Sequence, residues 1–246
     1  MENIWTKFTK EIGYATSSIQ YIELVSRIAC KNEIENIKDG KILELAKEYG
    51  LSLSCFPEDI TSCIASNYII HIQSCVESFL MDFKGLVGSP VYLKDDYNPE
   101  KTNRLKWTID HAQIAQTDEV KDLYNICNYY RLLRNKFVHP GKQSQDLKNA
   151  YSLLRNFEKG KLKALADIDT ICFDDQVLFS RSARRLLKII FKESKYNWNV
   201  IIENERENIK RFTKSYSNDI NRKQSHVINY LRRYYPVPKE DISKYL

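Results

Sequence analysis

The stretch YYRLLRNKFVHPG, residues 129–141, ends a helical pattern and contains one of the four histidines of this 246-residue chain. Apolar residues such as Cys127 and Tyr130 recur with helical spacing as the chain approaches it. A proline disfavours the helical conformation of the residue before it, and Pro140 follows His139 directly. The pattern therefore predicts a helix that ends within this stretch, with His139 just past its last turn.

Similar helical patterns dominate the rest of the chain. Seven glycines and six prolines are few for this length, and no window alternates apolar and polar residues as a half-buried strand would. We expect Gly50 to end the second pattern, Pro57 to open the third and Thr117 to cap the fourth. The sequence predicts an all-α protein with a loop over residues 85–103 and helices over residues 4–30, 33–49, 57–84, 117–138, 144 or 145 to 159, 178–191 and 198–234.

Cysteines and hydropathy limit the class of protein. The six cysteines include no Cys-x-x-Cys pair, which gives no indication of a zinc site or a thioredoxin-like redox site. The first residues lack the apolar core of a signal peptide, and no apolar run approaches transmembrane length. We therefore expect a cytoplasmic protein with reduced thiols, no membrane association and no cofactor.

The formal net charge of +6 is unevenly distributed along the chain. Residues 176–246 contain 16 Lys or Arg and 7 Asp or Glu, a balance of +9. The first 175 residues contain 22 Lys or Arg and 25 Asp or Glu, a balance of −3. A basic segment is typical of a surface that follows a nucleic-acid backbone, although solvated helix surface explains it equally well.

Arg134, Asn135 and His139 form the part of the opening stretch that can carry chemistry. On a continuous helix, a separation of five residues turns Arg134 and His139 about 140 degrees apart. The helix exit before Pro140 frees His139 to fold back towards the other two side chains. Arg134 shares the apolar stripe of the helix, which places its charge on a partly buried face, and such a charge needs a partner or a ligand.

These side-chain types suit cleavage of RNA without a metal ion. An imidazole can accept the proton of a ribose 2′-hydroxyl or donate one to the leaving 5′-oxygen, while a guanidinium holds the phosphate as its charge grows. An asparagine could orient either group. Because the motif supplies one histidine per chain, a twofold dimer that faces two copies of it would provide both the acid and the base.

A purely structural role for the same residues is the alternative. A histidine at a helix C-terminus interacts favourably with the helix dipole, and Pro-Gly commonly follows a helix. Residues 150–158, AYSLLRNFE, repeat Leu-Leu-Arg-Asn without a histidine, which shows that those four residues alone are typical of an amphipathic helix here. The information lies in the histidine and its spacing.

The other three histidines give no indication of a metal site. His71 is one helical turn from Tyr68 and Cys75, so we expect a packed side chain. His111 and His226 lie in separate predicted helices with no ligand-like spacing to another histidine or cysteine.

The segment RNKFVH, with RLL before it and proline after it, resembles the Arg-polar-x-x-x-His signature of the HEPN superfamily. That superfamily comprises helical domains of prokaryotic defence and toxin systems and of several RNA-processing proteins. The segment CVESFLMDF, residues 75–83, is similar to the first core helix of HEPN proteins with its glutamate, here Glu77. The resemblance implies an up-and-down four-helix bundle over residues 56–195, an N-terminal helical extension over residues 1–55 and a basic C-terminal helical extension over residues 196–246.

The resemblance also implies a metal-independent endoribonuclease that acts as a homodimer, in the manner of a toxin or antiviral defence effector. Arg134 and His139 would carry catalysis, with Asn135 as the polar companion. Transfer RNA is one candidate substrate, and an antitoxin or another regulatory partner could restrain the activity. The alternative is a HEPN-like module that binds RNA, a nucleotide or a protein without catalysis.

Further residues are candidates for supporting roles. Glu77 could lie near the site or only form a surface pair, and Tyr130 is expected in the core. Tyr129 could stack on a base. Cations beside the motif and in the following basic helix are candidates for RNA contacts: Arg131, Lys136, Arg181, Arg184, Arg185 and Lys188.

Overall fold

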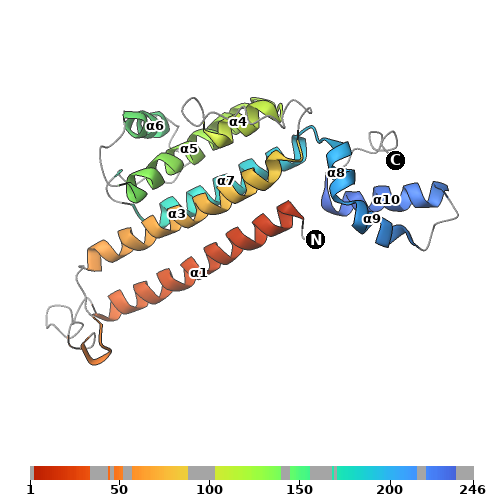
Figure 1. Ribbon diagram of the computed structural model, residues 1–246. Coiled ribbons are helices and arrows are strands. Elements are labelled where there is room, and N and C mark those ends of the chain that lie inside the picture. Colours follow the sequence, from red (N-terminus) through yellow and green to blue (C-terminus); the bar gives the residue numbers. More distant parts are fainter. Residues whose placement is uncertain are drawn as a thin grey trace. The chain divides into compact units, whose positions relative to one another are not determined.

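The computed structural model describes residues 3–33, 44, 47–51, 57–87, 103–139, 145–155, 168, 171–214 and 220–236. Its regular elements within those residues are all helices, and one isolated bridge joins Val87 to Tyr196 (Figure 1). The all-α prediction is therefore confirmed for the described chain. The helices are α1 (Ile4–Glu33), α3 (Pro57–Lys84), α4 (Arg104–His111), α5 (Asp118–Val138), α6 (Gln145–Arg155), α7 (Phe173–Glu193), α8 (Trp198–Asn204), α9 (Arg206–Thr213) and α10 (Ile220–Tyr234). None of them is long and apolar enough to cross a membrane.

Local signals predicted several helix ends correctly. Helix α3 begins at Pro57, and α5 ends at Val138 with His139 as the next residue. Thr117 caps α5, since its Oγ1 accepts a hydrogen bond from the Val120 N–H at 3.3 Å. Gly50 adopts a φ of 67°, the left-handed conformation expected after a helix. Most of the helix predicted over residues 33–49 and of the loop over residues 85–103 lies outside the described residues.

Three predictions of helix bounds were wrong. Helix α4 was not predicted, and α7 begins at Phe173, five residues before the predicted start. The single basic helix expected over residues 198–234 is divided into α8, α9 and α10. Its first break falls at Glu205, a buried residue between α8 and α9.

The chain divides into two compact units. Unit 1 contains Met1–Thr9, Val76–Tyr124 and Arg184–Leu246, and unit 2 contains Lys10–Cys75 and Asn125–Ala183. Helices α1, α3, α5 and α7 each contribute residues to both units. The boundaries expected from the family resemblance, after residues 55 and 195, stay predictions.

An aromatic cluster forms one core of unit 1. Trp5 of α1 stacks on Phe191 of α7 with ring centroids 5.6 Å apart, and Phe79 of α3 lies 5.2 Å from both Phe8 and Phe83. Phe79 and Phe83 are one helical turn apart, so α3 presents both rings to the same side. These contacts hold the ends of three helices together.

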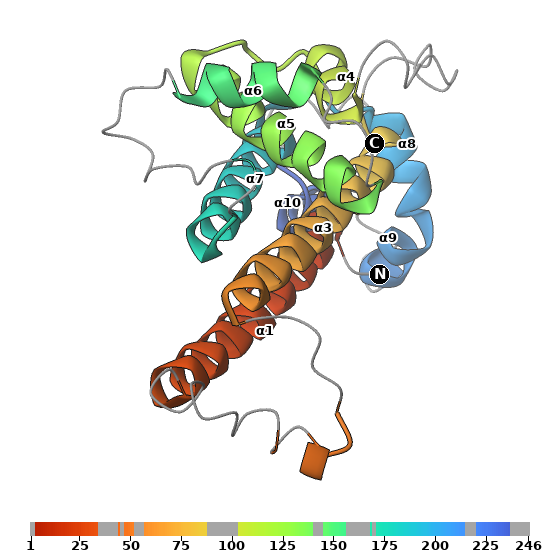
Figure 2. The ribbon, with the colours of Figure 1, turned by 90° about the vertical axis from the view of Figure 1, so that its left-hand side faces the viewer.

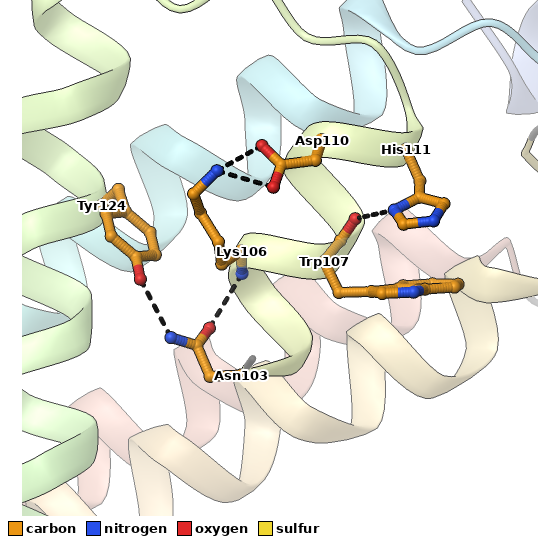
Figure 3. A network of polar contacts seen from close by, with 6 residues as sticks. All are labelled: Asn103, Lys106, Trp107, Asp110, His111 and Tyr124. Carbon is orange, nitrogen blue, oxygen red and sulfur yellow. Dashed lines mark hydrogen bonds and ion pairs between the residues drawn. The ribbon is translucent and has the colours of Figure 1, made fainter. Parts of the chain in front are cut away.

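Helix α4 is fixed in unit 1 by a polar network at its start (Figure 3). The Asn103 side chain accepts a hydrogen bond from the Lys106 N–H at 2.8 Å and donates one to the Tyr124 hydroxyl at 3.0 Å. Further along, the His111 ring stacks on Trp107 with centroids 4.4 Å apart. The cap satisfies one backbone donor in the first turn and fixes where α4 begins.

The core of unit 2 lies among the parts of α1, α3, α5, α6 and α7 that belong to it. Figures 1 and 2 both show α1 running alongside α3, and residues such as Ile12, Ile19, Ile69 and Ile72 are buried on these two helices. Tyr130 of α5 stacks on Phe179 of α7, with ring centroids 4.9 Å apart. This packing positions the end of α5.

Replacement of Phe79 by Ala should lower the free energy of unfolding by about 3 to 5 kcal/mol, because it opens a cavity in the aromatic cluster. Phe79 is 2% exposed, whereas Met81 on the same helix is 55% exposed. Met81→Ala should change stability by about 0.5 kcal/mol or less. Urea unfolding followed by circular dichroism measures both; equal losses for the two variants would contradict this packing.

Candidate active site

The motif residues lie on the last turns of α5 and just after it, within unit 2. The His139 N–H donates to the Asn135 carbonyl oxygen at 2.9 Å, so residue 139 completes the last helical turn directly above Asn135. The His139 side chain is exposed. Pro140 and Gly141, which were expected to form the exit, lie outside the described residues. The predicted place of His139, just past the helix end, is confirmed, whereas the approach of its imidazole to Arg134 and Asn135 stays a prediction.

Asn135 links Arg134 to this turn. The Arg134 Nη1 donates to the Asn135 Oδ1 at 3.2 Å, and Asn135 is also the residue whose backbone carbonyl holds the His139 N–H. One residue therefore contacts both partners, through its side chain on one side and its main chain on the other. The contact between Arg134 and Asn135 uses one of the five donors of the guanidinium.

Arg134 is half-buried, and its Nε is inaccessible to solvent without a hydrogen-bond partner among the described residues. A buried donor on a charged group costs free energy unless an acceptor reaches it. An anionic group with several oxygens, such as a phosphate, satisfies a guanidinium best because the planar fork matches its geometry.

A buried polar pair fixes α5 beneath the motif. The Tyr130 hydroxyl donates to the Asp175 Oδ1 at 2.9 Å, and the Cys172 N–H donates to the other carboxylate oxygen at 3.1 Å. Burial raises the pKa of the Asp175 carboxyl, and burial together with that carboxylate raises the pKa of the Tyr130 hydroxyl well above its ordinary value. The same carboxylate thus caps the start of α7 and binds α5.

The two tyrosines before the motif are core residues. Tyr130 was expected in the core and is fully buried. Tyr129 is only 1% exposed and lies 6.0 Å from the Tyr151 ring of α6, centroid to centroid. The suggestion that Tyr129 stacks on a base is therefore wrong for this conformation, because neither face of its ring is accessible. Both rings support the site through packing.

The cations next to the motif are partly engaged by the protein. Arg131 donates through Nε and Nη2 to the Asn128 Oδ1, at 3.2 and 2.9 Å, and both Arg131 and Lys136 are half-buried. Arg181 of α7, in the same unit, is exposed. A contact of these residues with RNA stays a prediction.

The remaining candidates belong to unit 1. Glu77 forms an ion pair with Arg104 at 3.7 Å, which is the surface-pair role that the sequence left open. Arg185 pairs with Glu119 at 2.8 Å, and the hydrogen bond from Arg185 lowers the pKa of the Glu119 carboxyl. Lys188 is exposed and Arg184 is half-buried.

The role of Asp175 was not predicted from the sequence, and the prediction for His71 was wrong. Asp175 precedes the helix predicted over residues 178–191, yet its place three residues after the capping residue Cys172 is a recognisable signal for the first turn of a helix. His71 was expected to be packed, but it is exposed on α3. The exposed Asn67, one turn earlier, lies on the same side of the helix as His71, whereas the neighbouring Ile72 is buried.

Comparisons with known proteins provide no independent assignment: no protein-family model, curated protein or solved structure matches this chain. Within the described part of the chain, no group of three or more His, Cys, Asp or Glu side chains is placed to hold a metal ion.

Replacement of Tyr130 by Phe should destabilise the protein by about 1.5 to 3 kcal/mol, because it removes a hydrogen bond to a buried carboxylate. Tyr124→Phe is the matched control, since the Tyr124 hydroxyl accepts a hydrogen bond from the neutral Asn103 amide in a half-buried place. It should cost only about 0.5 to 1.5 kcal/mol. Chemical unfolding measures both, and no loss for Tyr130→Phe would show that this bond does not hold α5.

The buried pair of Tyr130 and Asp175 should also affect how the stability of the protein depends on pH. Since burial raises the pKa of Asp175, the unfolded chain releases this proton at a lower pH than the folded chain does. Compared with Asp175→Asn, the wild type should therefore lose stability as the pH rises from the ordinary aspartate pKa to the raised value in the folded state. Unfolding of both proteins between about pH 3.5 and 7 tests this. If the difference in free energy of unfolding between the two proteins does not change with pH, or shifts in favour of the wild type as the pH rises, this prediction is wrong.

Proposed function

We propose that the protein is a HEPN-like, metal-independent endoribonuclease that cleaves RNA at the end of α5. The observation that carries the proposal is the constellation of Arg134, Asn135 and His139. A half-buried guanidinium with an unsatisfied donor is bonded to an amide, and an exposed imidazole follows on the turn above it. This set of groups fits one negatively charged phosphodiester better than it fits a neutral ligand.

The proposed reaction is a transesterification within the RNA backbone. A base removes the proton of the ribose 2′-hydroxyl, and the resulting oxygen attacks the adjacent phosphorus while the bond to the 5′-oxygen breaks. An acid then protonates that leaving oxygen, so the products are a 2′,3′-cyclic phosphate and a 5′-hydroxyl. His139 is the acid or base, and Arg134 stabilises the charge on the non-bridging oxygens.

Asn135 acts on this reaction as a positioning residue. Its side chain accepts the bond from Arg134, which limits the rotation of the guanidinium, and its carbonyl holds residue 139 in the last turn. A catalytic geometry depends on such supporting bonds because a misplacement of about 1 Å can cost about 100-fold in rate.

A second copy of the chain would complete the site. The reaction uses both an acid and a base, and each chain contributes one histidine at the end of α5. A twofold axis through this region would place His139 of both chains at one phosphate. We propose a homodimer that cuts cellular RNA as a toxin or antiviral effector, restrained by an antitoxin or another partner.

Purified protein should cleave cellular RNA in EDTA and leave 2′,3′-cyclic phosphate ends. His139→Ala should lower the rate by about 10² to 10⁴, the usual contribution of a general acid or base, and Arg134→Ala by a comparable factor. His71→Ala is the matched control, because it removes an exposed histidine from another helix of unit 2.

The outcomes separate enzyme from binding module. Cleavage that survives His139→Ala would overturn the assignment of the site. If the wild type, shown to be dimeric and free of inhibitor, binds RNA but releases no products, the chain is a HEPN-like binding module without catalysis. Measurement of the product ends by gel and mass spectrometry distinguishes transesterification from contamination by a metal-dependent nuclease.

A further inference from the structure

Helix α10 presents two opposite faces in the C-terminal part of unit 1. Its inner face contains Val227 and Leu231, which pack in one hydrophobic cluster with Trp198 and Ile201 of α8. Figure 1 shows α8, α9 and α10 gathered at this end of the chain. Because the inner face is fixed by packing, the direction of the outer face is fixed as well.

Polar contacts hold α10 in this rotation. The carboxylate of Glu205, at the junction of α8 and α9, accepts hydrogen bonds from the hydroxyls of Tyr230 at 2.7 Å and Tyr235 at 3.0 Å. Asn208 of α9 donates to the same carboxylate at 2.8 Å. Burial, together with Glu205, raises the pKa of both tyrosines, so these donors keep their protons at physiological pH.

The outer face of α10 is a cationic stripe. Arg222, Ser225, Asn229 and Arg232 follow one another at intervals of three, four and three residues, and all of them are exposed. Arg233 lies beside Arg232 and is also exposed. This spacing places the five side chains on one side of the helix, with arginines at both ends over a length of about 16 Å and neutral hydrogen-bonding groups between them.

The charge of α10 differs from that of its neighbour α9. Helix α10 contains no Asp or Glu. On α9, Lys210 pairs with Glu207 at 2.8 Å, and Arg206 pairs with Glu203 of α8 at 3.3 Å. A surface that only keeps a protein soluble mixes both signs of charge. The charged residues of α10 are therefore all of one sign.

Arg233 is held in place at one end of the stripe. Its guanidinium lies 5.5 Å from the centre of the Phe212 ring of α9, a cation–π contact that leaves its edge donors free for other bonds. An arginine restrained in this way loses less side-chain entropy when it binds a phosphate.

We infer that the outer face of α10 is a docking surface for the phosphodiester backbone of RNA. Arg222, Arg232 and Arg233 contact phosphates. Ser225 and Asn229, between them, form hydrogen bonds with sugars and base edges. The choice of RNA rests on the proposed function. Arg222 at one end and Arg232 and Arg233 at the other are about 16 Å apart, a distance that spans several nucleotides. The surface would hold a substrate through contacts that do not depend strongly on sequence.

Binding of a labelled RNA oligonucleotide to the full chain tests the inference. The measurements use the His139→Ala background, so that the RNA stays intact, and fluorescence anisotropy at several salt concentrations. Replacement of Arg222, Arg232 and Arg233 by Gln should raise Kd at least about tenfold. Each lost phosphate contact lowers the slope of log Kd against log salt by about 0.7, so the three replacements together should lower it by about two. Replacement of the same residues by Lys should keep most of the slope.

A charge-matched control separates a docking surface from net charge. Lys121, Arg206 and Lys210 each form an ion pair with an acidic residue three positions away. Their triple replacement by Gln removes the same formal charge and should leave the slope within about 0.5 of the parent value. If both triple variants lose affinity equally, or if neither does, α10 is not the docking surface.

Two further results keep this inference distinguishable from the proposed function. A wild type that does not cleave RNA, but whose RNA binding depends on α10, overturns the nuclease and leaves the docking surface standing. If the replacements on α10 weaken binding of a DNA strand of the same sequence as much as they weaken binding of the RNA, the surface recognises the phosphate backbone alone. That result would overturn the proposed contacts with the ribose. Circular dichroism and urea unfolding of each triple variant confirm that the helices are retained.

Discussion

The hydrogen bond between the Tyr130 hydroxyl and the buried Asp175 carboxylate determines where the candidate site lies. It joins α5 to the first turn of α7 within unit 2, and the stacking of Tyr130 on Phe179 adds apolar contact to the same joint. Because Tyr130 and Arg134 are four residues apart, they share one side of α5. Burial of the tyrosine therefore brings the guanidinium of Arg134 to the edge of the core, where it is half-buried.

A charged group at the edge of a core has few ways to lower its free energy. Arg134 satisfies one of its donors with Asn135, and its Nε remains buried without a partner in the described chain. The helix ends one turn later, where Asn135 also holds the backbone of His139. The fold thus places a guanidinium with one unsatisfied donor one turn before an exposed histidine at the end of the same helix. That combination is the physical basis of the proposed chemistry.

Local constraints in the sequence were sufficient for the helical class and for the end of α5. The proline at position 140 and the apolar spacing before it act over a few residues, so they can be recognised without a structure. The break of the basic segment at Glu205 could not be, because it depends on Tyr230 and Tyr235, which are 25 and 30 residues away. The role of Asp175 likewise depends on Tyr130, which is 45 residues away.

The most direct test of the central claim compares an RNA oligonucleotide with its fully 2′-O-methylated counterpart, both incubated with the wild-type protein in EDTA. In the proposed reaction the attacking atom is the ribose 2′-oxygen, and methylation removes the proton that a base must take. The account predicts cleavage of the RNA and none of the methylated strand. Cleavage of both strands, or of neither, would contradict metal-free transesterification by Arg134 and His139.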